Sequence, residues 1–443
     1  MVPEIFPLIF ACYSAPSTLF FRDTSLLSAE GVQQGDPLGP LLFCLVIHPL
    51  VLQLRSELRL FYLDDGTLGG PEEGVLRDLE FIERQAASLG LHLNRSKTEL
   101  ICTEQGGKKI LCAAPTLCKV LPEQATILGS PIGQRDSIDT SLADKAQALK
   151  TMGTRLSHFS KHDAITLLRH SIAIPRVMYL LRTAPCFLSP LLKSFDLELR
   201  SCLSTILNVN LVDDSTWTQA TLPTGSGGIG VRNTTQLAPS AFLASAAGCM
   251  SLIEQILPPR LHGTSHPAVE DALQEWRMGH SHQPPASPEN VHQRSWDQPR
   301  VQAALDRLLD ATTDQKDRAR LLAASTKESG AWLNAPPISS LGLRMDDEVV
   351  RIAVGLRLGA PLCHPHSCCH CGAVVDKRAI HGLSCYKSEG RHSRHAAINN
   401  IIKRSLAAAQ IPSVLEPPGL CRSDGKRPDG VTIIPWKTGR TLV

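Results

Sequence analysis

The stretch Leu58 to Gly70, LRLFYLDDGTLGG, predicts a β-hairpin with two adjacent carboxylates at its tip. Its apolar first half has the residues of a buried strand. Asp64-Asp65-Gly66 would form the turn, because Asp tolerates a positive φ and Gly adopts one without steric cost. Two neighbouring aspartates repel each other, and Mg²⁺, which prefers hard oxygen ligands, would keep both ionised. Taken alone, these three residues also fit an ordinary Asp-Gly turn.

A loop rich in glycine and proline, GVQQGDPLGP at residues 31–40, precedes this hairpin. Its glycines allow a ligand to approach the backbone closely. The pattern predicts a helix from about Leu41 to Arg55, with Pro40 in its first turn. A helix N-terminus after such a loop suits a phosphate or a base pair, although it also fits a purely structural loop.

The segment after the hairpin predicts one amphipathic helix and three short strands. Apolar residues at spacings of three and four predict the helix at Pro71–Leu89. Two strands are expected at Leu91–Asn94 and Glu99–Cys102, and a third, followed by a tight turn, within Ile127–Gly133. Lys97 lies between the first two of these strands, where it either approaches a triphosphate or closes a turn.

Composition allows two or three domains in 443 residues, of which 43% are hydrophobic. The formal net charge of +3 is unevenly distributed. Residues 1–100 are acidic overall, whereas residues 361–443 hold 12 Lys and Arg against five Asp and Glu. The basic end favours contact with a polyanion, or forms a solvated surface.

The 14 cysteines do not resemble a secreted disulfide framework, because the chain is long and no signal peptide opens it. The apolar runs Ile5–Tyr13 and Leu41–Leu54 are too short or too interrupted to span a membrane. We therefore expect a soluble intracellular protein without membrane contact.

A cluster of cysteine and histidine near the C-terminus predicts a metal site. Cys368, Cys371, His381 and Cys385 have the spacing C-x2-C-x9-H-x3-C, which suits a structural tetrahedral Zn²⁺. Four further residues leave the register of the ligands open: Cys363, His366, Cys369 and His370. Reduced cysteines without a metal are the alternative.

Basic residues follow this cluster on a predicted helix that ends at Ala409. Arg391, Arg394, Lys403 and Arg404 suit contacts to nucleic-acid backbone phosphates. Beyond the helix, the sequence RPDG places Asp429 in a turn before a strand.

Four motifs occur in the order and spacing of reverse transcriptase palm motifs: GVQQGDPLGPLLF, FYLDDG, GLHLNRSKTE and ILGSPIG. The chain resembles reverse transcriptases of non-LTR retrotransposons. This resemblance implies that Asp64 and Asp65 bind catalytic Mg²⁺, and that Gln34, Gly35 and Tyr62 line the template and the incoming nucleotide.

The same resemblance implies that Lys97 assists the departure of pyrophosphate. The implied reaction is RNA-templated DNA synthesis by two-metal nucleotidyl transfer from deoxynucleoside triphosphates, starting from a DNA primer.

The family uses a third aspartate upstream of the glutamine-glycine loop. Asp23 is the sole aspartate before this loop, and its context, FFRDTS, resembles a later linking strand instead. We therefore expect a fragment truncated at both ends and inactive as a polymerase. The alternative is a non-catalytic, zinc-stabilised nucleic-acid-binding remnant.

The C-terminal motifs resemble the restriction-like endonuclease of early-branching non-LTR elements. The resemblance implies that Asp429 is the first metal-binding acid, that target DNA is a partner, and that an active element works in the nucleus. Lys437 does not match the catalytic lysine of that family. No specific protein partner is inferred.

The expected fold class is α+β, with five segments. They are a partial palm at 1–135, a helical thumb at 136–255, a flexible connector at 256–300, a helical linker at 301–360, and a zinc knuckle with the start of an α/β nuclease at 361–443. Arg351 and Arg357 are expected on a solvated face. The sequence GSGGIG at 225–230 is interpreted as a flexible turn, because no strand precedes it.

Overall fold

The computed structural model describes residues 3–132, 135–263, 266–285, 292–388, 390–421, 425, 427–435 and 437–442. The side chains of Arg391 and His392 lie outside this description. The expected phosphate contact of Arg391 therefore stays a prediction.

The chain folds into two compact units, each assembled from three separate stretches of sequence. Unit 1 comprises Met1–Thr154, Leu168–Leu199 and Arg232–Asp306. Unit 2 comprises Arg155–Leu167, Arg200–Val231 and Arg307–Val443. Helices combined with small sheets make up the structure, which agrees with the predicted α+β class.

The first part of unit 1 contains short helices and two-stranded sheets. In chain order its elements are η1 (Pro3–Ile5), α1 (Phe6–Tyr13), β1 (Ser17–Phe21), β2 (Thr24–Ser28), α2 (Gly39–Val51), β3 (Leu58–Tyr62), β4 (Asp65–Gly69), α3 (Glu72–Ser88), β5 (Glu99–Ile101), α4 (Lys108–Ala113), β6 (Cys118–Val120), η2 (Pro122–Gln124), β7 (Thr126–Ile127) and β8 (Ser130–Pro131). All of these strands pair as antiparallel hairpins except β5 and β6, which are parallel.

Helices α2 and α3 form where the sequence predicts them. Pro40 lies in the first turn of α2, and Pro71 is the residue before α3. The apolar faces of both helices meet the β3–β4 hairpin in a small core of Leu50, Leu54 and Ala86, against which Phe61 and Phe81 pack. This core holds the predicted acidic hairpin against two helices.

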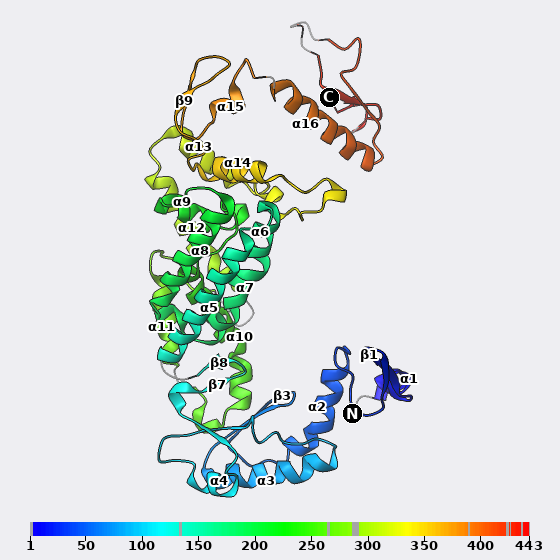
Figure 1. The fold of residues 1–443 in the computed structure, drawn as a ribbon, viewed down its shortest axis with the longest axis vertical. Coiled ribbons are helices and arrows are strands. Elements are labelled where there is room, and N and C mark those ends of the chain that lie inside the picture. Colours follow the sequence, from blue (N-terminus) through cyan, green and yellow to red (C-terminus); the bar gives the residue numbers. More distant parts are fainter. Residues whose placement is uncertain are drawn as a thin grey trace. The chain divides into compact units, whose positions relative to one another are not determined.

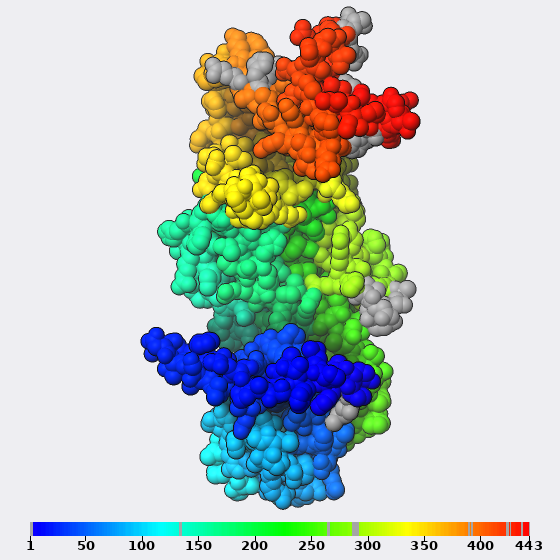
Figure 2. Space-filling model, turned by 90° about the vertical axis from the view of Figure 1, so that its right-hand side faces the viewer, coloured from blue at the N-terminus to red at the C-terminus, as the bar shows by residue number. Residues whose placement is uncertain are grey.

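The β1–β2 hairpin and α1 present apolar side chains to solvent. Phe20 and Leu27 are the most exposed of these, and Figure 2 shows the segment, in dark blue, facing the viewer. Each strand of this hairpin pairs only with the other among the described residues.

The remainder of unit 1 is helical. Its elements are α5 (Arg135–Leu156), the π-helical segment η3 (Leu168–Ile172), α7 (Ile174–Thr183), η4 (Cys186–Leu188), α8 (Leu191–Leu207), α10 (Thr234–Ile256), η6 (Pro259–Leu261), α11 (Pro267–Arg277) and α12 (Gln293–Ala311). Helix α10 packs against both α7 and α11 (Figure 1). Helices α5, α8 and α12 extend beyond the stretches assigned to unit 1.

The segment expected as a flexible connector contains the ordered helix α11. Trp276 on this helix is fully buried and packs edge-on against Trp296 of α12 at 5.5 Å between ring centroids. This part of the chain therefore contains a buried tryptophan pair, although its Pro, His and Ser residues predict a flexible connector. The division of the chain into five segments stays a prediction.

Unit 2 is helical in its first part and mixed near the C-terminus. Its elements are α6 (Lys161–Leu167), α9 (Asp214–Ala220), η5 (Thr224–Ser226), α13 (Gln315–Ala324), η8 (Ala331–Asn334), η9 (Ser339–Leu341), α14 (Asp347–Leu358), β9 (His366–Ser367), β10 (Val374–Val375), α15 (His381–Ser384), α16 (Gly390–Ala408), β11 (Ser413–Leu415) and β12 (Gly430–Thr432). Helix α14 contacts α6, α9 and α13, and buries Val350, Val354 and Leu358 among them.

Two helical segments are long and apolar enough to cross a membrane by length and composition alone. They are Lys161–Thr183 and Thr234–Ile256, and in each a substantial share of the apolar window is buried. Core helices of water-soluble proteins have the same properties, so these segments are weak indicators of a membrane.

Candidate functional site

The acidic hairpin turns one residue earlier than the sequence suggests. Tyr62 pairs with Asp65, so the turn consists of Leu63 and Asp64, whereas Asp65 begins β4. Leu63 adopts the left-handed φ of +57°, a conformation that disfavours an L residue by about 1–2 kcal/mol. The prediction that Asp64-Asp65-Gly66 forms the turn is therefore wrong, although the hairpin itself is confirmed.

Gly66 is needed for a different reason from the one predicted. A Cβ atom at this position would lie 2.6 Å from a ring carbon of Phe61, its cross-strand neighbour. The absence of a side chain lets the Phe61 ring cover the strand, and a positive φ is not involved.

The side chains at the hairpin tip are open to solvent. Asp64 and Asp65 are exposed, and Tyr62 retains 64% of its accessible surface. In the part of the chain that the structure describes, neither aspartate has a side-chain hydrogen bond or an ion pair, and no third carboxylate groups with them into a metal cluster. The tip therefore offers two adjacent, accessible carboxylates to a cation.

Asp78 holds the start of the strand that leads to this tip. Its carboxylate is only 4% exposed and accepts hydrogen bonds from the Arg55 amide at 2.8 Å, the Ser56 amide at 2.6 Å and the Ser56 hydroxyl at 2.6 Å. Asp78 was not among the predicted site residues. Its position on the apolar face of α3, three residues after Val75 and four before Ile82, was the available signal.

The loop containing Gln34 and Gly35 is shaped by Asp36. The Tyr13 hydroxyl and the Leu38 amide both donate to the Asp36 carboxylate, the amide at 2.8 Å. Gln34 and Gly35 stay exposed, and Gly35 has a φ of +93°. The Tyr13 hydrogen bond, followed by that of Leu38, lowers the pKa of Asp36 below its ordinary value.

We predict that this contact makes the loop sensitive to acid. Because the native pKa of Asp36 lies below the unfolded value of about 3.9, the stability it contributes is complete above that pH. It is lost as pH falls through the native pKa. In Tyr13→Phe the pKa of Asp36 should rise towards its ordinary value, as measured by carboxyl ¹³C NMR titration. Tyr179→Phe is the control, because Tyr179 donates to the Leu128 carbonyl instead; an equal rise there would contradict the prediction.

Lys97 lies in an exposed turn, and its amide donates to Asn94 at 3.1 Å. No ion pair joins its amine to Asp64 or Asp65 among the described residues. The prediction of a strand at Leu91–Asn94 is wrong. This segment is an irregular connection after α3. The strand predicted at Glu99–Cys102 is confirmed as β5, which covers Glu99–Ile101.

The four predicted zinc ligands come together in unit 2. The ligand atoms of Cys368, Cys371, His381 and Cys385 all lie within 4.8 Å of one another. Two of the pairs are Cys368 Sγ to Cys385 Sγ at 3.9 Å and Cys371 Sγ to His381 Nε2 at 3.1 Å. Zn–S bonds of about 2.3 Å place tetrahedral sulfur ligands roughly 3.8 Å apart, so the donors fit this ion.

The alternative ligands point elsewhere. The Cys363 thiol donates to the Asp376 carbonyl at 3.3 Å, and His366 Nδ1 contacts the His364 carbonyl. Cys369 and His370 are exposed. Amides of Cys371 and His370 donate to the Cys368 sulfur and lower the pKa of this thiol to about 6, which favours the thiolate that binds metal.

The C-terminal residues surround an open groove of about 800 Å³ between α16 and the β11–β12 hairpin. Lys403, Arg427 and Asp429 line it, and Asp429 Oδ1 lies 3.2 Å from His395 Nε2. The Thr432 amide donates to the Leu442 carbonyl, and the Leu442 amide donates to the Thr432 hydroxyl, both at 3.0 Å, so the chain continues alongside β12. Arg404 is exposed on α16, whereas Arg394 donates to the Leu383 carbonyl at 2.9 Å.

The prediction that Arg357 lies on a solvated face is wrong. Its guanidinium is buried and donates to backbone carbonyls of Thr224, Gly228, Ala324 and Ser329. The segment GSGGIG is therefore a loop tied to a buried cation. Arg351 pairs with the exposed Glu348 at 2.8 Å.

The first part of the chain matches a known protein family. Residues 2–153 match the family described as Reverse transcriptase (RNA-dependent DNA polymerase). A reverse transcriptase domain is present. No curated protein matches the chain.

The reverse transcriptase domain covers the first third of the chain and includes the acidic hairpin, the Gln34–Gly35 loop and Lys97. The activity of this family requires divalent metal, an RNA template and nucleotide substrates. The domain identification confirms the coarse prediction made from the four motifs.

Proposed function

We propose that the chain is part of the RNA-directed DNA polymerase of a non-LTR retrotransposon. The observation that carries this proposal is the acidic hairpin inside the reverse transcriptase domain, with Asp64 and Asp65 accessible at its tip. Gln34 and Gly35 would contact the template and the incoming nucleotide. Lys97 would lie near the leaving pyrophosphate.

Asp64 and Asp65 are the residues that would hold Mg²⁺. When bound there, Mg²⁺ would lower the pKa of the primer hydroxyl and neutralise charge on the leaving pyrophosphate. The family uses a third aspartate at its metal site, and among the described residues no third carboxylate groups with Asp64 and Asp65. The chain as it stands is therefore proposed to bind template and primer without extending the primer.

Primer extension on an RNA template tests both parts of this proposal. We expect the chain to bind an RNA–DNA duplex, with affinity that falls as salt rises, and to add no nucleotide in Mg²⁺. Binding in fluorescence anisotropy should change little in Asp64→Ala. Incorporation by the unchanged chain that disappears in Asp64→Ala would reject the inactive state and support the metal role. Failure to bind the duplex would reject the polymerase assignment.

Zinc is the second cofactor of the proposal. Four donors within bonding reach of one ion, three of them cysteine sulfurs, support a closed structural site at Cys368, Cys371, His381 and Cys385. No disulfide joins the described cysteines, which favours the reducing interior of a cell, and an active element would work in the nucleus.

The groove beside α16 supports a role for the C-terminal residues in binding target DNA. Lys403 and Arg427 provide positive charge there, and Asp429 would be the first metal-binding acid of a restriction-like endonuclease. Arg391, Arg394 and Arg404 would contact backbone phosphates from α16. The same features also suit a zinc-stabilised nucleic-acid-binding chain without nuclease activity.

A further inference from the structure

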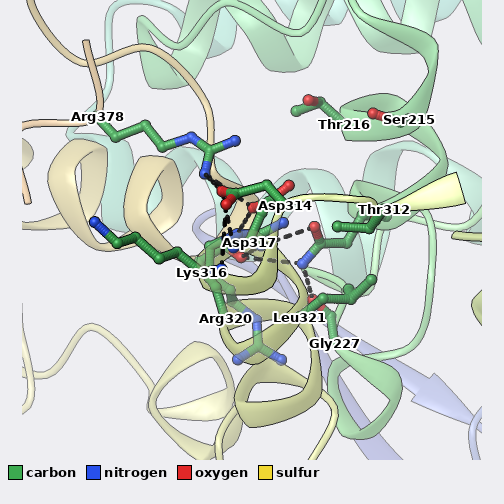
Figure 3. A network of polar contacts seen from close by, with 12 residues as sticks. Ser215, Thr216, Gly227, Thr312, Asp314, Lys316, Asp317, Arg320, Leu321 and Arg378 are labelled. Carbon is green, nitrogen blue, oxygen red and sulfur yellow. Dashed lines mark hydrogen bonds and ion pairs between the residues drawn. The ribbon is translucent and has the colours of Figure 1, made fainter. Parts of the chain in front are cut away.

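Arg378 joins the cysteine-histidine cluster to the helical part of unit 2. It lies between β10 and α15, in the loop that connects Cys371 to His381. Its Nη1 atom lies 3.1 Å from Asp317 Oδ1 and 4.0 Å from Asp314 Oδ2, both on or beside the first turn of α13. Figure 3 shows the guanidinium pointing at these carboxylates.

The acidic side of this junction belongs to a larger network within α13. Asp314 accepts the Lys316 and Asp317 amides and so caps the helix. Asp317 Oδ1 also accepts from Arg320 Nε at 2.6 Å. Arg320 continues to the side chain of Gln219 and to the backbone carbonyl of Arg357. One carboxylate therefore connects Arg378 to the buried core around Arg357.

The position of Arg378 depends on the folding of the loop between Cys371 and His381. The Lys377 carbonyl accepts from the Leu362 and Cys363 amides, at 2.7 and 3.2 Å. Arg378 follows directly, its amide donates to Asp376 Oδ1, and His381 comes three residues later. The loop thus has Arg378 near its middle and candidate metal ligands at both ends.

We propose that Arg378 couples metal binding in the cysteine-histidine cluster to the stability of α13 and the Arg357 core. The inference rests on the proposed zinc site. Bound zinc would join Cys371 to His381 and close the loop, so the free energy of metal binding would offset the entropy lost when the loop is ordered. Without zinc, the Arg378–Asp317 ion pair must itself hold the loop in place, and it forms in a smaller fraction of molecules.

Hydrogen exchange of the full chain tests this coupling. Removing zinc with a chelator should speed exchange of the α13 amides, such as Arg318, by about fivefold to tenfold, because a half-buried ion pair contributes on the order of 1 kcal/mol. Arg378→Gln should still bind one zinc per chain, but its α13 amides should exchange at the same rate with and without metal. Arg378→Lys, which keeps the charge, should restore part of the response.

Lys377→Gln is the matched control, because it removes the same charge from the adjacent position. The Lys377 side chain has no ion pair among the described residues, so this variant should respond to zinc as the unchanged chain does. An Arg378→Gln variant whose α13 amides still respond fully would overturn the coupling. Unchanged chain that binds no zinc would overturn the zinc site and the coupling together, and the zinc content measured in each sample separates the two failures.

Discussion

Replacing Arg357 with methionine is expected to destabilise unit 2 by about 3–5 kcal/mol. Methionine has a similar length but no hydrogen-bond donors. The change would leave buried carbonyls of Thr224, Gly228, Ala324 and Ser329 without the guanidinium that now serves them. Burial lowers the pKa of Arg357, which reflects the cost of placing this charge in the core. Urea unfolding followed by circular dichroism measures the loss.

Arg351→Met provides the control on the same helix, α14. Arg351 pairs with Glu348, which is largely exposed, and donates one longer hydrogen bond to the Leu362 carbonyl at 3.3 Å, so its replacement should cost only about 1 kcal/mol. An Arg357→Met loss of only about 1 kcal/mol, no larger than that of Arg351→Met, would show that the buried carbonyl contacts of Arg357 contribute little. Arg357 would then contribute no more to the free energy of unfolding than a surface ion pair does.

Replacing Trp276 with alanine is expected to destabilise unit 1 by about 3–5 kcal/mol. The side chain is 0% exposed, packs with Phe242, Leu243 and Trp296, and donates from Nε1 to the Trp296 carbonyl at 2.7 Å. Trp276→Phe should lose less, because it keeps an aromatic ring and the Ser240 hydroxyl still donates to that carbonyl. Chemical unfolding detected by circular dichroism again gives the loss.

Leu252→Ala is the control for unit 1, since Leu252 lies on α10 with more than half of its surface exposed. Its replacement should change stability by less than about 0.5 kcal/mol. A Trp276→Ala variant as stable as Leu252→Ala would mean that the packing of α11 contributes little to the stability of unit 1. The segment would then behave as the flexible connector that the sequence predicts.

The features that the sequence predicts well are local ones. The hairpin at Leu58 to Gly70 and the helix after it follow from periodicity and turn residues within a few positions of each other. The exact turn does not, because Leu63 takes an unfavourable φ that is held by pairing and by Phe61 packing over Gly66. Local propensity yields to packing at this position.

Burial and pairing over long distances explain the remaining differences. Arg357 resembles a surface arginine in sequence, and only the approach of Thr224 and Ala324, distant in the chain, makes it internal. Spacing restricted the metal ligands to a few sets, and folding of the loop selected Cys368, Cys371, His381 and Cys385 among them. Tyr13 and Asp36 gave no pattern that links them across 23 positions.

The chain passes from one unit to the other five times, at residues 154, 167, 199, 231 and 306. No single proteolytic cut or cloning boundary can therefore release either unit whole. During synthesis, unit 1 cannot be completed until about residue 306 has left the ribosome, although its reverse transcriptase segment emerges first. The apolar side chains of β1 and β2 are exposed to solvent throughout that interval. A short expression fragment that contains only the β1–β2 hairpin and its neighbours should therefore depend on chaperones or aggregate.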